Sequence, residues 1–277
     1  MRLGAPLQSS FETPEAWIAA VRAKGYRAAY SPLPLDAPAS QRAEYRQAAE
    51  EADIVIAEVG AWSNPLSPNP ETANAAFAKM VEALRLADDL GARCSVNIAG
   101  SRGEKWDGPD AGDLTEETFA AIVEMCRKVI AEAAPKSARL SLEPMPWMYP
   151  HSAESYARLI NEIDHPRFAV HYDPVNLINS PPKYFANRAE VDRFVDLLGP
   201  QIVSVHVKDI VLGDRLTTHL DECIPGEGGF DIEHLLTRLD ALEPDLPVML
   251  EHLKSETEYD RAAAFVRTEA ERVGVRL

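Results

Sequence analysis

Four residues able to bind a metal ion end four consecutive apolar segments in the second half of the sequence. They are Glu143, Asp173, His206 and Glu251. Each polar residue closes a run that otherwise favours burial, and burying an unpaired carboxylate costs free energy. A shared divalent cation would compensate, because three carboxylates and one imidazole suit Mn²⁺ or Mg²⁺, with Co²⁺ or Zn²⁺ as alternatives. Any one of these residues alone would be read as structural, but together they favour one metal site.

Eight short segments rich in β-branched residues precede or contain these residues and are predicted to be strands. The run Ile54-Val55-Ile56-Ala57 is typical of a strand covered on both faces by helices. The predicted strands are Arg2–Leu7, Arg27–Tyr30, Asp53–Val59, Cys94–Ala99, Ala138–Glu143, Phe168–Asp173, Ile202–Lys208 and Pro247–His252.

Amphipathic stretches with recognisable start and stop signals separate the predicted strands. One helix is predicted over 70–90, with Asn69 as its N-cap and Gly91 just past its end. A second is predicted from about Asp113 to Ile130. The last helix opens with the capping-box pattern of residues 255–258 and ends near residue 274.

This alternation predicts an α/β protein with a single (βα)8 TIM-barrel domain over residues 1–277. An open doubly wound sheet is the alternative, but no Gly-x-Gly-x-x-Gly motif follows the first strand. In a barrel, the carboxyl ends of all strands meet at one face, where active sites lie. The four candidate ligands would therefore meet at that face.

The charge balance limits the partners. Lys plus Arg is 28 against 44 Asp plus Glu, which gives a formal net charge of −16 and disfavours nucleic acid and anionic membrane surfaces. The hydrophobic fraction of 46% excludes disorder. The three cysteines lack metal-type spacing, residues 1–6 show no apolar h-region, and no apolar run approaches the length of about 18 residues that a membrane span needs. We expect reduced thiols in a cytoplasmic protein.

Five motifs together resemble the xylose-isomerase-like TIM-barrel family, the sugar phosphate isomerase/epimerase superfamily. They are Leu-Glu143-Pro, Tyr-Asp173-Pro-Val-Asn176, Val-His206-Val-Lys208-Asp209, Pro225-Gly226-Glu227-Gly228 and Leu-Glu251-His. The family includes ketose 3-epimerases, inosose dehydratase, hydroxypyruvate isomerase and, more distantly, endonuclease IV.

The resemblance implies one metal ion held by Glu143, Asp173, His206 and Glu251. It also implies a small-molecule carbohydrate substrate that chelates this ion. Glu143 and Glu251 would act as acid and base on opposite faces of the carbon beside the carbonyl. The predicted activity is a metal-dependent isomerase or epimerase, and whether the chain forms a homo-oligomer stays open.

Two departures from the ketose 3-epimerases keep other functions open. Asn176 stands where those enzymes have a histidine, and Glu222 where they have an arginine. A metal-dependent lyase or dehydratase acting on a keto-sugar, inosose or keto-glycoside is the close alternative, and a non-catalytic sugar-binding barrel is a further one. An endonuclease is disfavoured, because the histidines that its three zinc ions need are missing from 58–62 and 97–100.

Several other residues are candidates for contact with substrate. Lys208 either reaches a substrate oxygen or pairs with Asp209, and Asn176 follows the strand-six aspartate. His171 shares the inward parity of Asp173, and we expect it to support a ligand or pack rather than bind metal. His151 and Trp147 lie in the loop after strand five, where aromatic rings often stack on sugars, although Trp147 suits an ordinary loop position equally.

The remaining candidates are of lesser weight. We expect His219 and His252 to be surface or supporting residues. The glycine-rich segment 225–229 is similar to a phosphate-binding loop, but Glu227 in its middle argues against an anionic ligand. The substrate is therefore predicted to be a neutral polyol or keto-sugar.

Overall fold

The computed structural model describes all residues, 1–277, and its central feature is a ring of eight parallel strands. Hydrogen-bonded neighbours follow the order β1-β10-β7-β6-β5-β4-β3-β2. Between β1 and β2, the Arg27 amide donates to the Leu3 carbonyl at 3.0 Å and brings the ring close to closure. The strands are β1 (Arg2–Gly4), β2 (Ala28–Tyr30), β3 (Val55–Gly60), β4 (Cys94–Asn97), β5 (Arg139–Leu142), β6 (Phe168–Tyr172), β7 (Ile202–Val207) and β10 (Pro247–Leu250).

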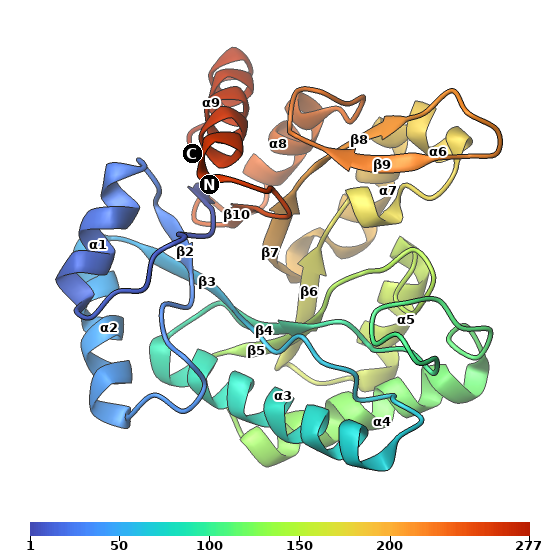
Figure 1. Cartoon of the computed structure of the whole chain (residues 1–277), viewed down its shortest axis with the longest axis horizontal. Coiled ribbons are helices and arrows are strands. Elements are labelled where there is room, and N and C mark those ends of the chain that lie inside the picture. The colour runs from blue at the N-terminus through green and yellow to red at the C-terminus, as the bar shows by residue number, and fades with distance from the viewer.

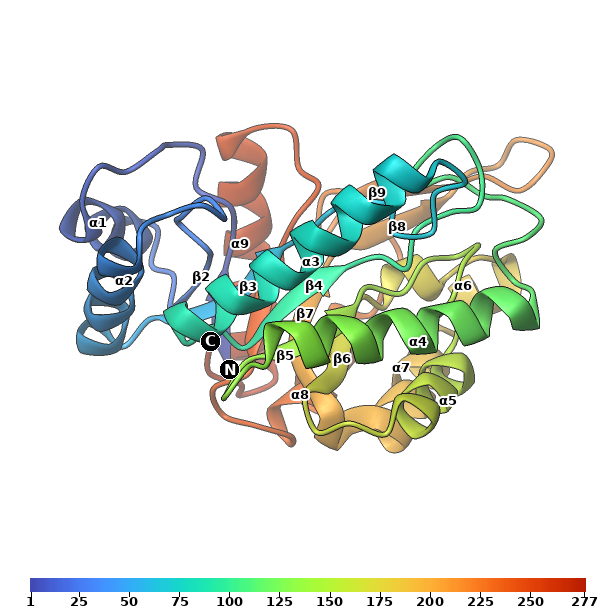
Figure 2. The same cartoon turned by 90° about the horizontal axis from the view of Figure 1, so that it is seen from below.

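Helices cover the outside of this ring (Figure 1). They are α1 (Pro14–Ala23), α2 (Ala39–Ala52), α3 (Pro70–Leu90), α4 (Glu116–Ala133), α5 (Ala153–Ile163), α6 (Pro181–Phe185), α7 (Asn187–Leu198), α8 (Ile232–Asp240) and α9 (Glu256–Arg272), with short 3-10 turns at Val175–Leu177 and Gly199–Gln201. Figure 2 shows α3 and α4 side by side along one flank. The TIM-barrel prediction is confirmed.

The predicted helix signals work as expected at three helix ends. The Asn69 side chain accepts the Glu71 amide at 2.9 Å at the start of α3, and Gly91 ends that helix in the left-handed region at a φ of 68°. The last helix is capped by Ser255, which accepts the Glu258 amide at 3.3 Å.

Several features differ from the sequence prediction. Strands β1 and β4 end at Gly4 and Asn97, earlier than the predicted Leu7 and Ala99. Helix α4 begins at Glu116 rather than near Asp113, because Asp113 is fully buried and accepts the Ser101 hydroxyl at 3.0 Å and the Arg102 amide at 2.7 Å. An antiparallel hairpin of β8 (Asp209–Leu212) and β9 (Leu220–Cys223) follows β7, and Figure 1 shows it extending beyond the barrel near α6.

The three cysteines are free thiols in this structure. Cys94 and Cys126 are buried free thiols, and Cys223 is a partly buried one. None of the helices combines the length and the apolar character that crossing a membrane would require.

Candidate metal centre

The four residues singled out in the sequence lie together at the carboxyl end of the barrel. Glu143 and Asp173 directly follow β5 and β6, His206 lies in β7 and Glu251 directly follows β10. One ligand atom from each lies within 4.8 Å of the others. His206 Nδ1 is 2.9 Å from Glu251 Oε1, 3.3 Å from Glu143 Oε1 and 3.7 Å from Asp173 Oδ2. The cluster arises because parallel strands all end at the same face.

Lys208 lies inside this cluster. Its Nζ is 2.5 Å from Glu251 Oε1, 2.7 Å from Asp173 Oδ2 and 3.6 Å from Glu143 Oε1. The predicted alternative pairing with Asp209 is wrong. Successive residues of a strand point to opposite faces, so Lys208 shares the inward face of His206 while Asp209 points away.

The residues present fit a divalent cation. Asp173 Oδ2 and Glu251 Oε1 are shielded from solvent and accept no well-aligned hydrogen bond, so only the nearby charges of Lys208 and His206 compensate them. The donor set of three carboxylates and one imidazole suits Mg²⁺ or Mn²⁺. The Lys208 ammonium also reaches Glu222 Oε1 at 3.3 Å and the Asn176 side-chain oxygen at 3.5 Å, so it has partners at the edge of the cluster.

The cluster separates the proton affinities of its carboxyl groups. Burial and the nearby charge of Glu251 raise the pKa of Glu143 to about 7, although Lys208 and His206 act in the opposite direction. Burial also opposes the ionisation of Asp173 and Glu251, but the positive charges of Lys208 and His206 hold their pKa values below the usual range. In the metal-free protein, one carboxyl group of the cluster therefore holds its proton far more readily than its neighbours.

Glu58 is a buried carboxylate that the sequence analysis did not single out. It lies on β3, is 1% exposed, and places Oε1 3.0 Å from His206 Nε2. Its Oε2 is 3.3 Å from His171 Nδ1, and the His171 and His206 rings meet edge to face with centroids 4.1 Å apart. The available signal was a carboxylate inside an apolar strand. His171 has surroundings that match its expected supporting or packing role.

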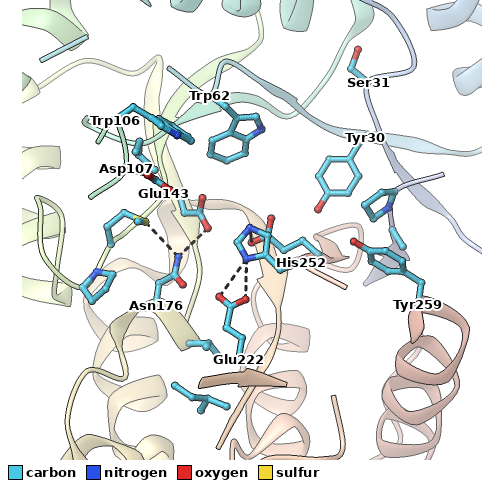
Figure 3. Close-up of a pocket in the computed structure, with 18 of the residues that line it drawn as sticks. Tyr30, Ser31, Trp62, Trp106, Asp107, Glu143, Asn176, Glu222, His252 and Tyr259 are labelled. Carbon is cyan, nitrogen blue, oxygen red and sulfur yellow. Dashed lines mark hydrogen bonds and ion pairs between the residues drawn. The ribbon is translucent and has the colours of Figure 1, made fainter. Parts of the chain in front are cut away.

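A large cavity opens beside the cluster. Its volume is about 1490 Å³, and Glu143 and Glu251 form part of its wall. Figure 3 shows Trp62 and Trp106 on one side of it, and Tyr30 and Tyr259 on another. The cavity combines apolar walls with a few polar groups, as small-molecule sites do.

The other predicted substrate contacts divide into two groups. Asn176 and Trp147 line the cavity, where Asn176 Nδ2 donates to Glu143 Oε1 at 3.1 Å and Trp147 Nε1 donates to the Asp107 carbonyl at 3.0 Å. Lys208, His171 and His151 do not line it. The His151 ring instead packs on the ring of Tyr149, with centroids 5.2 Å apart.

His252 is exposed, in agreement with its predicted surface or supporting position, and it also lines the cavity. It lies directly after Glu251 with a φ of 57°, a region uncommon for residues other than glycine. Its Nδ1 is 3.0 Å from Glu222 Oε2 (Figure 3), and this contact raises the pKa of His252. Glu222, noted as a departure from the ketose 3-epimerases, is thus part of the cavity wall.

The glycine-rich segment 225–229 does not offer its amides to a ligand. Asp209 Oδ2 accepts the amides of Gly226 and Gly228 at 2.9 and 3.0 Å. Asp209 Oδ1 accepts those of Ile210 and Phe230 at 2.8 and 3.0 Å. The chain's own carboxylate therefore takes the place that a phosphate group would need.

Several solved structures are similar to this chain in fold. A D-psicose 3-epimerase from Clostridium cellulolyticum H10, solved with D-tagatose, is 17% identical with a TM-score of 0.70, covering 100% of both chains. A 3-keto-D-glucoside 4-epimerase from E. coli is 16% identical with a TM-score of 0.67, covering 97% of this chain and 99% of that one. A xylose isomerase-like TIM-barrel protein from Mycobacterium smegmatis, solved in complex with magnesium, is 15% identical with a TM-score of 0.66, covering 95% and 91%.

Sequence comparison gives one further result. No curated protein matches the chain. The model of one family does, over residues 18–269, which is most of the sequence and includes all four clustered residues. The chain therefore belongs to the xylose isomerase-like TIM barrel family.

Proposed function

We propose that the protein is a divalent-metal-dependent sugar isomerase or epimerase that moves a proton on the carbon beside a carbonyl. The observation that carries this proposal is the meeting of Glu143, Asp173, His206 and Glu251 within 4.8 Å, at the edge of a large cavity. Bound by these residues, Mn²⁺ or Mg²⁺ would polarise the substrate carbonyl and acidify the neighbouring C–H bond.

Glu143 and Glu251 are the proposed acid–base pair. They come from β5 and β10, which lie on either side of β6 and β7 in the ring, so they approach the cluster from different directions. One glutamate would take the proton from one face of the substrate carbon, and the other would return a proton to the opposite face. Asn176, which donates to Glu143, and Trp147 are proposed to orient the substrate.

The substrate proposed for this site is an uncharged keto-sugar that still carries a glycosidic substituent. The cavity of about 1490 Å³ exceeds the range of roughly 300–1,000 Å³ common for small-molecule sites. Its exposed tryptophans, Trp62 and Trp106, offer flat faces to a further ring. The amides that Asp209 occupies leave no phosphate-binding loop, which supports a neutral substrate.

Exchange of carbon-bound protons tests the reaction class. The Mn²⁺-loaded protein should incorporate deuterium from heavy water into at least one member of a panel of ketoses, inososes and 3-keto-glycosides. An epimerase would return the epimer, whereas the lyase alternative would release a leaving group. Absence of exchange on every member would contradict proton abstraction, and a preference in kcat/KM for phosphorylated counterparts would contradict the neutral substrate.

Two variants test the acid–base pair. Glu143→Gln and Glu251→Gln keep a coordinating oxygen but remove the basic group, so each should retain metal, lose most of kcat and differ in which epimer still exchanges. Glu227→Gln, a loop carboxylate paired with Arg261, is the matched control and should behave as wild type. Near-wild-type turnover in either test variant would limit that glutamate to metal binding.

A further inference from the structure

The two ring nitrogens of His206 face different surroundings. Nδ1 points at Glu143, Asp173 and Glu251, at 2.9 to 3.7 Å. Nε2 points away from that cluster and meets Glu58 Oε1 at 3.0 Å. An imidazole can coordinate a cation only through a nitrogen that carries no proton. Which nitrogen carries the proton therefore decides whether His206 can complete the cluster.

Glu58 contacts His206 from across the barrel. Strands β3 and β7 are separated in the ring by β4, β5 and β6 on one side and by β10, β1 and β2 on the other. The Glu58 carboxylate is 1% exposed, so it is costly to bury unless it accepts hydrogen bonds. The nearest ring nitrogen that could donate to Oε1 is His206 Nε2, at 3.0 Å.

His171 restrains the same pair. Its ring lies against that of His206 with an interplanar angle of 74° and centroids 4.1 Å apart, which limits rotation of the His206 ring. Its Nδ1 is 3.3 Å from Glu58 Oε2, but the two atoms are not aligned for a hydrogen bond, so His171 acts on the pair by packing. All three side chains are buried, and none of them lines the cavity.

We propose that Glu58 is a positioning residue that keeps the proton of His206 on Nε2 and thereby leaves Nδ1 for the divalent cation. His171 packs against the His206 ring and limits its rotation. This role rests on the proposed metal-dependent function. Carboxylates that orient a metal-binding histidine in this way change metal affinity by about 10- to 100-fold when they are removed.

A second metal ion between Glu58, His171 and His206 is a competing interpretation of the same residues, because their side chains could form a three-ligand group. The direct contact of 3.0 Å between Glu58 Oε1 and His206 Nε2 is a hydrogen-bond distance and leaves no room for an ion on that line. The group also lacks an opening to the cavity. The positioning role explains the contact between Glu58 and His206 with one proton, that on Nε2, and needs no second ion.

Metal binding by the full-length protein tests the proposal. Titration of the metal-free protein with Mg²⁺ in a calorimeter should give a Kd for Glu58→Gln about 10- to 100-fold above that of wild type. Glu58→Asp keeps the charge but shortens the side chain, so it should weaken binding similarly if the contact matters. A Kd within twofold of wild type in both variants would overturn the proposal.

The protonation state of His206 gives a readout that needs no variant. In the Mg²⁺-loaded wild-type protein, nitrogen NMR of the histidine rings should show His206 protonated at Nε2 and not at Nδ1. The reverse pattern would overturn the proposal even if the Glu58 variants fail to fold. A stoichiometry of two ions per chain would favour the competing metal site. Failure of the wild type to bind either Mg²⁺ or Mn²⁺ would instead refute the proposed function itself.

Discussion

Replacing Asp209 by asparagine should destabilise the protein more than its conservative chemistry suggests. Each Asp209 carboxylate oxygen accepts two backbone amides, those of Ile210 and Phe230 on Oδ1 and those of Gly226 and Gly228 on Oδ2. The side chain is buried at 2% exposure. In Asp209→Asn, one oxygen becomes an NH₂ group that faces two N–H donors, so two amides lose their acceptor. The amides of Ile210 and Phe230 belong to buried residues, whereas those of Gly226 and Gly228 are only partly buried.

The expected loss follows from those two amides. Leaving one fully buried donor without a partner costs about 1–3 kcal/mol. Asparagine can turn its NH₂ group toward the partly buried amides of Gly226 and Gly228, so Asp209→Asn should lower the free energy of unfolding by about 2 kcal/mol, the lower end for two donors. That is a large part of the roughly 5–15 kcal/mol available to a folded domain. Urea unfolding followed by far-ultraviolet circular dichroism measures this difference, provided that the slope of the transition is unchanged.

Asp231 provides the matched control for this measurement. It caps α8 by accepting a single amide, that of His234 at 2.8 Å, and asparagine is an equally good N-cap. Asp231→Asn should therefore change the free energy of unfolding by less than about 0.5 kcal/mol. If Asp209→Asn were equally mild, the argument that its carboxylate holds segment 225–229 would be refuted.

Three further predictions concern the cluster, the pH response and the strand pairing. Lys208→Met removes the ammonium from among three carboxylates, so the free energy of unfolding of the metal-free protein should fall by about 3–5 kcal/mol. Mg²⁺ should then raise the melting temperature of the variant more than that of wild type. Equal melting temperatures of the two metal-free proteins would contradict this. Burial opposes the ionisation of Asp88, but hydrogen bonds from the amides of residues 136–138 lower its pKa from 3.8 to about 2. The ionised Asp88 therefore stabilises the folded protein fully above about pH 4, and this contribution is lost as the pH falls through 2. Because Asp88 is only half-buried, Asp88→Ala should lower the free energy of unfolding at pH 7 by only about 1 kcal/mol. At pH 2 the urea midpoints of the variant and of wild type should approach each other. A difference between the two midpoints that does not change with pH would contradict this. The Tyr156 hydroxyl lies 2.7 to 3.3 Å from four backbone atoms of β5 and β6, whereas the Tyr45 hydroxyl has one such contact. Tyr156→Phe should therefore lower the free energy of unfolding by about 1–3 kcal/mol, and by more than Tyr45→Phe does.

The sequence by itself predicted the barrel and the four clustered residues for a simple reason. Eight alternating strand and helix signals leave few arrangements, and in a parallel barrel every strand presents its carboxyl end to the same face. The residues that end strands in the sequence are therefore neighbours in space. This is why Glu143, Asp173, His206 and Glu251 could be grouped without knowledge of distances.

Contacts across the barrel or between a strand and a distant loop depend on how far each strand is staggered, and local patterns do not encode that stagger. The pairing shifts register between Ala29 and Tyr30 and again between Val170 and His171. Only the tertiary structure could therefore bring Glu58 to His206, or fill the turn at 225–229 with the Asp209 carboxylate. The sequence left two roles open for Lys208. Its position among three carboxylates was decided by the closure of the ring, which brings the ends of β5, β6 and β10 within reach of one ammonium group.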